Sequence, residues 1–127
     1  MTRPMRRRPR TAMESRTTSA LRLLGLARRA GAVAPGTGAA RRAIREGEAQ
    51  LVLIARDASS VQVDKIRTTM HDKAIPQVVL GDRNTLGAAL GLGPLTAVAV
   101  TSATLAEKLV RELEVPRNEG STDAVEA

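Results

Sequence analysis

The chain has 127 residues and a formal net charge of +7, and its 43% hydrophobic content is enough for one folded domain with one core and additional tails. It contains no cysteine and a single histidine, which excludes a disulfide framework, thiolate zinc ligands, a multi-histidine metal site and a cysteine nucleophile. It also has no Phe, Trp or Tyr, which argues against nucleic-acid modules that stack bases on aromatic rings.

Positive charge is concentrated at the beginning of the chain. Residues 1–48 hold 12 arginines and three acidic residues, a net charge of +9, whereas residues 49–127 carry −2. This asymmetry is typical of a surface that faces a polyanion. Residues 1–16 show no hydrophobic periodicity, so we predict a disordered basic arm there. An Arg-rich organellar transit segment is the alternative for the same residues.

Helical and strand patterns alternate through the middle of the chain, so residues 17–114 are the predicted folded domain. We expect helices at about 19–30, 37–46, 60–74, 83–90 and 102–113, and strands at 32–34, 51–55, 77–80 and 95–100. Helices alternating with short buried strands predict an α/β fold, namely a three-layer α/β/α sandwich with a small four-stranded, mainly parallel (mixed) sheet. The polar segment 115–127 is predicted to be a disordered tail.

Two helix starts carry clear capping signals. Ser59 with Gln62 three residues later forms a capping box, and Asp82 can cap the helix that follows it. The spacing after Ser59 predicts that the helix buries Val63, Ile66, Met70 and Ala74.

The first candidate site is Gly36-Thr37-Gly38 at the start of a predicted helix. Glycines let a ligand approach the backbone, and the unpaired N–H groups of a helix start attract anions. Three arginines follow this turn, namely Arg41, Arg42 and Arg45, and a cluster of three precedes it, namely Arg22, Arg28 and Arg29. Dinucleotide and P-loop motifs both lack required residues here. The sequence therefore favours a polyanion-binding helix start, with a glycine turn beside a solvated basic face as the alternative.

The second candidate is the run Gly91-Leu92-Gly93-Pro94, which is either an ordinary helix stop or a loop that presents Leu92 as an exposed apolar wedge. The remaining polar residues offer little chemistry. Asp57 follows a strand end, but loop capping accounts for it. Because no catalytic triad, metal-ligand set or phosphate-loop lysine is present, we expect no enzymatic activity, no cofactor, no metal and no small-molecule substrate.

Several stretches together resemble the kink-turn RNA-binding family of ribosomal proteins, known as the L-seven-Ae, L-thirty-e and Gadd-forty-five group, and most closely its small bacterial YlxQ-type branch. The stretches are Leu24-Gly25-Leu26-Ala27-Arg28-Arg29-Ala30-Gly31, Gly36 through Ile44, Leu51 through Ser59, Ile75-Pro76, Leu80-Gly81-Asp82-Arg83, Leu86-Gly87, and Ala97 through Val100. The likeness covers about 20–113, and it implies the same α/β/α sandwich.

The resemblance implies two RNA-contacting surfaces. The first is a Gly-x-Asn-Glu-x-x-Lys helix start that reads sheared G·A pairs; its glycine matches Gly36 and its lysine matches Arg42. Its Asn and Glu positions hold Gly38 and Ala39, so two base-reading side chains are missing. The second surface is the loop 91–95, which covers unstacked nucleotides with apolar contacts.

These observations predict a non-enzymatic, cytoplasmic protein that binds structured, kink-turn-like RNA in translation, with the ribosome as a candidate partner and no membrane contact. Selectivity for kink-turns is expected to be weakened or altered, because phosphate contacts position a protein whereas base contacts specify its target. The predicted RNA-binding residues are Gly36, Thr37, Gly38, Arg41, Arg42, Arg45, Arg28, Arg29, Leu92, Gly93 and Pro94. The alternative is a protein-interaction module on the same fold that has lost specific RNA readout.

Overall fold

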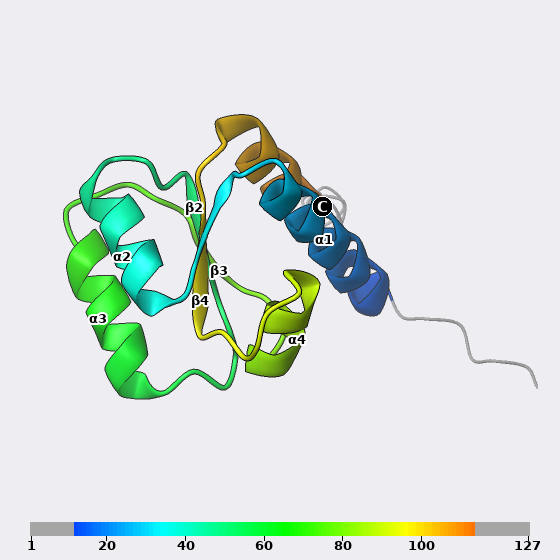
Figure 1. Ribbon diagram of the computed structural model, residues 1–127, viewed down its shortest axis with the longest axis horizontal. Coiled ribbons are helices and arrows are strands. Elements are labelled where there is room, and N and C mark those ends of the chain that lie inside the picture. Colours follow the sequence, from blue (N-terminus) through cyan, green and yellow to red (C-terminus); the bar gives the residue numbers. More distant parts are fainter. Residues whose placement is uncertain (1–11, 114–127) are drawn as a thin grey trace, which may run out of the picture.

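The computed structural model describes residues 12–113 and shows a sheet covered on both faces by helices (Figure 1). The elements in chain order are α1 (Ala12–Arg29), β1 (Val33–Pro35), α2 (Thr37–Arg45), β2 (Leu51–Ile54), α3 (Ser60–Met70), β3 (Gln77–Val79), α4 (Arg83–Ala89), β4 (Ala97–Val100) and a further helix over residues 103–113. Helices α2 and α3 cover one face of the sheet, and α1, α4 and the helix 103–113 cover the other (Figure 1).

The core has one apolar cluster on each side of the sheet. The central strand β2 is fully buried, and its successive side chains point to opposite faces, as strand geometry requires. Leu51 and Leu53 pack with Leu24 of α1, whereas Val52 and Ile54 pack with α2 and α3. A continuous apolar run at β2 is therefore explained by helices on both faces, and the predicted three-layer α/β/α sandwich is confirmed.

The sheet has four strands in the order β1-β4-β2-β3. Strand β2 runs parallel to β3, whereas β4 runs antiparallel to both of its neighbours, β1 and β2. Three strands thus share one direction and the sheet is mixed, as predicted. Because the reversed strand β4 lies inside the sheet, only one of the three strand pairings is parallel.

Element positions agree with the predicted ones except at the start of α1 and the end of α3. Helix α1 begins at Ala12 rather than near residue 19, so it extends into the segment 1–16 that was expected to be an arm. Residues 12–18 include Ala, Met, Glu and Arg, which favour helix but form no regular apolar stripe, so periodicity alone missed these first turns. The rest of the predicted arm (1–11) and the predicted tail (115–127) lie outside the described residues.

Both predicted caps are confirmed. The backbone N–H of Gln62 donates to Ser59 Oγ at 3.2 Å, and that of Thr85 donates to Asp82 Oδ1 at 2.8 Å. Burial along α3 follows the predicted spacing only in part: Ile66 and Met70 are buried and Val63 is half-buried, but Ala74 is exposed. The prediction for Ala74 is wrong because α3 ends at Met70, four residues before it.

Candidate nucleic-acid interface

One edge of the sheet collects both predicted binding segments. Strands β1, β2 and β3 end at this edge and the reversed strand β4 begins there, as the pairs Pro35 with Val98 and Ile54 with Ala97 show. Helix α2 follows the end of β1, and the loop 91–95 leads into β4. The mixed topology therefore brings them to the carboxyl ends of the strands, where α/β sheets commonly bind ligands.

The turn into α2 needs a glycine because of its backbone. Gly36 has φ 96° and ψ 157°, which L side chains rarely adopt. Its N–H donates to the carbonyl of Ala97 at 2.8 Å, which ties the turn to the start of β4. The N-cap residue Gly36 makes no side-chain cap hydrogen bond to α2, and the first N–H groups of a helix without such a cap can bind an anion.

The loop 91–95 is seated on α4 by backbone contacts. The N–H groups of Gly91 and Leu92 donate to carbonyls of α4, and the N–H of Leu95 donates to the carbonyl of Arg83 at 3.0 Å. A Cβ at Gly87 would lie 1.9 Å from the carbonyl oxygen of Gly93, so the loop packs directly on this glycine. The loop shape is therefore fixed, with Leu92 36% exposed to solvent.

The two segments lie next to each other. A Cβ at Gly36 would be 4.0 Å from Cδ2 of Leu95, the last residue of the loop. About 60 residues of chain separate the helix start from the loop, so the contact is a product of the fold. The structure therefore places the turn at Gly36 beside Leu95, at the end of the loop 91–95.

Arg42 and Arg45 are exposed on α2, in the turns that follow the glycines. Arg42 Nε lies 3.6 Å from Oε2 of Glu46, and the two side chains are 71% and 53% exposed. An exposed ion pair of this kind contributes only about 0.3–0.5 kcal/mol, so Glu46 competes weakly with a phosphate for this guanidinium. Within residues 15–113, Arg45 has no ion-pair partner.

Arg41 points from α2 toward α3. Its Nε donates to Thr69 Oγ1 on α3 at 2.9 Å, and the Thr69 hydroxyl in turn donates to the carbonyl of Lys65. The side chain is half-buried between the two helices. The contact with α3 thus sets the direction of the Arg41 side chain, and its predicted role in RNA binding stays a prediction.

Arg28 and Arg29 come from the end of α1, on the opposite side of the sheet from α2. They precede β1 whereas Gly36 follows it, so they stand at the other end of this strand. Arg28 Nη1 donates to the carbonyl of Leu90 and lies beside Gly91. Arg28 thus reaches the beginning of the loop 91–95, whereas Arg29 lies over a groove between α1 and α4. The five arginines do not form one cluster.

Most of the described chain matches one family of proteins. The model of the Ribosomal protein L7Ae/L30e/S12e/Gadd45 family matches residues 18–110. The chain belongs to this family. The match includes the α2 start, the loop 91–95 and the whole sheet.

Individual relatives agree with the family assignment. The chain is 36% identical over 92 residues to the RNA-binding protein YlxQ of Bacillus subtilis, which covers 72% of this chain and 92% of that protein. A solved structure of a Bacillus halodurans protein of unknown function has 30% identity and a TM-score of 0.70, over 75% of this chain and 96% of that one. A Giardia lamblia 15.5kD RNA binding protein shares the fold, with 23% identity and a TM-score of 0.67, over 80% and 89% of the two chains.

This L7Ae-family chain has room for the polar side chains that it lacks at α2. Gly38 is exposed, and a Cβ there would meet nothing within 4 Å. Ala39 is half-buried beside it. The difference from the Gly-x-Asn-Glu-x-x-Lys pattern is therefore chemical: the helix start keeps its shape and its N–H groups but has no side-chain amide or carboxylate for reading base edges.

Two arginines that the sequence analysis did not select lie at the same edge. Arg56 and Arg83 follow the ends of β2 and β3, and their side chains are 65% and 51% exposed. Arg56 Nη2 lies 3.5 Å from Asp82 Oδ2, and Arg83 Nε lies 3.4 Å from Asp57 Oδ2. Because the carboxyl ends of parallel neighbours meet at one edge, the positions of Asp57 and Asp82 after two strands were the signal for this cluster.

The aspartates of this cluster fix the start of α4. Asp57 Oδ1 accepts the backbone N–H of Arg83 at 2.8 Å, so the loop-capping role predicted for Asp57 is confirmed. Asp82 caps the helix, and the backbone N–H and hydroxyl of Thr85, together with Arg56, hold the pKa of its carboxyl below the usual 3.8. These contacts position α4, on which the loop 91–95 rests.

The described residues include neither a metal-ligand cluster nor a membrane-spanning helix. No group of three or more His, Asp or Glu side chains in that part of the chain is arranged to hold a metal ion. Likewise, none of the helices within it is both long and apolar enough to cross a bilayer.

Proposed function

We propose that this protein is a non-enzymatic RNA-binding protein that recognises structured, kink-turn-like RNA in translation, in association with the ribosome. The observation that carries the proposal is the contact between the uncapped glycine start of α2 and the fixed loop 91–95 at one sheet edge. Membership of a ribosomal-protein family and 36% identity to a protein named as RNA-binding support it.

The RNA lies across this edge in the proposed complex. Phosphates contact the N–H groups that follow Gly36 and the exposed guanidinium of Arg42, and Leu92 covers unstacked nucleotides beside them. Arg56 and Arg83 extend the cationic surface along the edge. Arg28 reaches the same loop from α1, whereas Arg41 contributes no direct contact while it is bonded to Thr69.

The first test compares two RNAs. A kink-turn RNA and a straight duplex of equal length are titrated into the full chain at two salt concentrations. We expect both RNAs to bind at low salt and the affinity to fall steeply as salt rises, because neutralised phosphates release counterions. The kink-turn is expected to retain a modest advantage at the higher salt. Failure to bind either RNA at low salt would end the proposal.

The second test places the contact. Replacing Arg42→Ala should weaken kink-turn binding roughly three- to tenfold, since a charge-assisted contact to RNA is lost. Arg111→Ala is the matched control, because Arg111 forms the same kind of exposed i,i+4 pair, with Glu107 at 3.4 Å. Equal losses in the two variants would mean that only overall charge matters.

A protein-interaction module is the second candidate. It is favoured by the absence of polar base-reading groups at Gly38 and Ala39 and by the pairing of Arg42 with Glu46. In that case the edge has kept its shape but lost its RNA partner. The two-salt titration distinguishes the two candidate functions, because a protein-interaction module should show no preference for the kink-turn over the straight duplex at the higher salt.

A further inference from the structure

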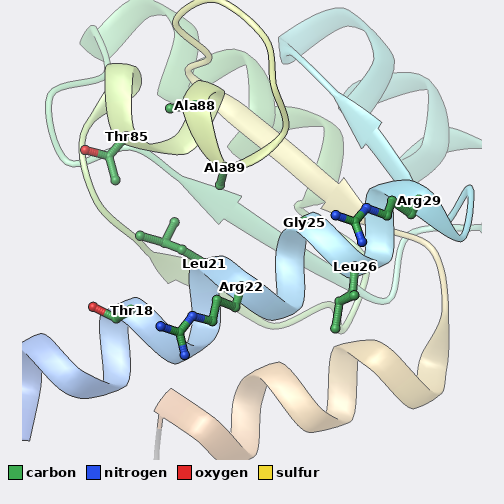
Figure 2. Close-up of a pocket in the computed structure, with 9 residues that line it drawn as sticks. All are labelled: Thr18, Leu21, Arg22, Gly25, Leu26, Arg29, Thr85, Ala88 and Ala89. Atoms are coloured by element: carbon green, nitrogen blue, oxygen red, sulfur yellow. The ribbon is translucent and has the colours of Figure 1, made fainter.

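A groove between α1 and α4 lies outside the interface described above (Figure 2). It has a volume of about 740 Å³. The groove forms where small residues of the two helices meet, since Gly25 of α1 faces Ala88 and Ala89 of α4. The helices are close there: a Cβ at Gly25 would lie 3.1 Å from the carbonyl oxygen of Ala89. Leu21 and Leu26 make the groove apolar, and Leu26 is 52% exposed.

Two arginines flank this apolar surface, and none of the described residues that line it is acidic. Arg22 and Arg29 lie seven residues apart on one face of α1, which corresponds to roughly 10 Å along the helix axis. Leu26 lies between them in the sequence. The groove is therefore complementary to a short segment with small apolar side chains in the middle and a carboxylate at each end, about 10 Å apart.

Residues 114–127 contain such a segment. This part of the chain holds four acidic residues and one arginine, a net charge of −3, in a protein of net charge +7. Within it, Asp123 and Glu126 bracket Ala124 and Val125. In a polyproline II conformation, which has three residues per turn and a rise of about 3.1 Å per residue, Asp123 and Glu126 would lie on one face about 9 Å apart, close to the spacing of the two arginines.

The helix 103–113 brings this segment close to the groove. It packs along α1, since Leu109 and Leu113 belong to the same apolar cluster as Leu21. Arg22 also lines a second hollow, between α1 and this helix, so the chain leaves Leu113 near one end of the groove. Ten extended residues cover more than 30 Å, so Asp123 is within reach, and the short connection keeps its local concentration high.

We propose that residues 123–126 dock into the groove between α1 and α4 of the same chain. Asp123 and Glu126 pair with Arg22 and Arg29, and Val125 covers Leu26. The inference is independent of RNA binding, because all of its contacts lie within one chain.

A spin label tests the docking in the full chain. The chain has no cysteine, so Ser121→Cys gives one site for a nitroxide. We expect the label to cause loss of the amide NMR signals of Gly25, Leu26 and Ala88 and to leave those of α3 unchanged. A mixture of unlabelled ¹⁵N-protein with spin-labelled ¹⁴N-protein should show no loss, since the contact is intramolecular. Loss in the mixture, or no loss at the groove, overturns the proposal.

Two double variants, each carrying the labelled Ser121→Cys, test the proposed pairing. Asp123→Asn with Glu126→Gln should restore the groove signals, whereas Glu114→Gln with Glu119→Gln removes the same charge from the same segment and should leave the loss intact. All four positions lie outside residues 12–113, so neither pair changes a side chain of the described core. Equal restoration by both pairs would mean general attraction between an acidic segment and a basic domain, which contradicts specific docking.

Discussion

The two halves of the proposed RNA surface are built in different ways. The loop 91–95 takes its shape from backbone contacts with α4, and Gly87 has no room for even a Cβ against it. At the start of α2, Gly38 has open space around it, and the side chains that contribute charge are exposed. The loop is thus fixed by packing, whereas the chemistry of the helix start depends on replaceable side chains.

This difference suggests that the shape of the RNA surface and its preference among RNAs can be changed separately. A substitution at Gly87, on which the loop 91–95 packs, should lower both the stability of the fold and the affinity for RNA, because the loop backbone would have to shift. A change on the exposed face of α2 should alter which RNA is preferred without affecting the fold. The following predictions test this separation, beginning with the largest expected effect.

Gly87→Ala should be the most damaging single change. Its Cβ would meet the backbone of Gly93, which cannot rotate away as a side chain can, so the loop must shift. We expect a loss of about 2–3 kcal/mol in the free energy of unfolding, measured by urea denaturation, as for other overpacked sites. The amide NMR signals of residues 91–95 should shift in the same variant.

The matched control for that change is Gly38→Ala. It adds the same methyl group within a helix, at a position where nothing lies within 4 Å. Stability should change by less than about 1 kcal/mol and toward greater stability, because alanine favours helix more than glycine does. Equal destabilisation by the two substitutions would contradict the proposed seating of the loop.

The second prediction concerns selectivity. The double variant Gly38→Asn with Ala39→Glu supplies the polar groups that the resemblance implies at these positions. Since a good polar base contact contributes about 1–3 kcal/mol, the preference for a kink-turn over a straight duplex should rise roughly tenfold or more. The ratio of the two dissociation constants at the higher salt measures it. An unchanged ratio would place base recognition elsewhere.

The smallest expected effect is the pH dependence of the Asp82 cap of α4, the helix on which the loop 91–95 packs. The folded state lowers the pKa of Asp82, so the ionised carboxylate stabilises the fold above the unfolded pKa near 3.8, and this contribution is lost as pH falls through the folded pKa. Asp82→Asn keeps a capping side chain but removes the charge. The unfolding temperature of wild type should be higher than that of the variant at pH 7, and the difference should close toward pH 3.

Asp64→Asn is the control for this prediction. It removes an exposed carboxylate from α3 that has no ion-pair partner among residues 15–113. Its unfolding temperature should differ little from wild type at either pH. A gap between wild type and Asp82→Asn that stays constant from pH 7 to pH 3 would show that charge at Asp82 has no part in the cap.

Local signals in the sequence were sufficient for most of the fold. Apolar periodicity placed the helices and strands, and side-chain chemistry placed the caps at Ser59 and Asp82, because these features depend on neighbouring residues. Strand direction is not encoded in periodicity, so the position of the reversed strand β4 inside the sheet came only from the structure. Likewise, the first turns of α1 carry no apolar stripe and were missed.

The candidate site was less predictable, because it depends on contacts between distant segments. The glycine turn and the loop were recognisable separately, and their contact through Gly36 and Leu95 needed the fold. The direction of Arg41 is set by Thr69 on another helix, which spacing within α2 cannot show. Arg56 and Arg83 were overlooked since their aspartate partners were considered only as local caps.

The most direct test of the account is a titration of kink-turn RNA into ¹⁵N-labelled full chain at a salt concentration where straight duplex no longer binds. If the α2 start and the loop form one RNA surface, the amide signals of Gly36, Gly38 and Leu92 should shift together with one dissociation constant. Shifts confined to other parts of the chain, with these three signals unmoved, would contradict it.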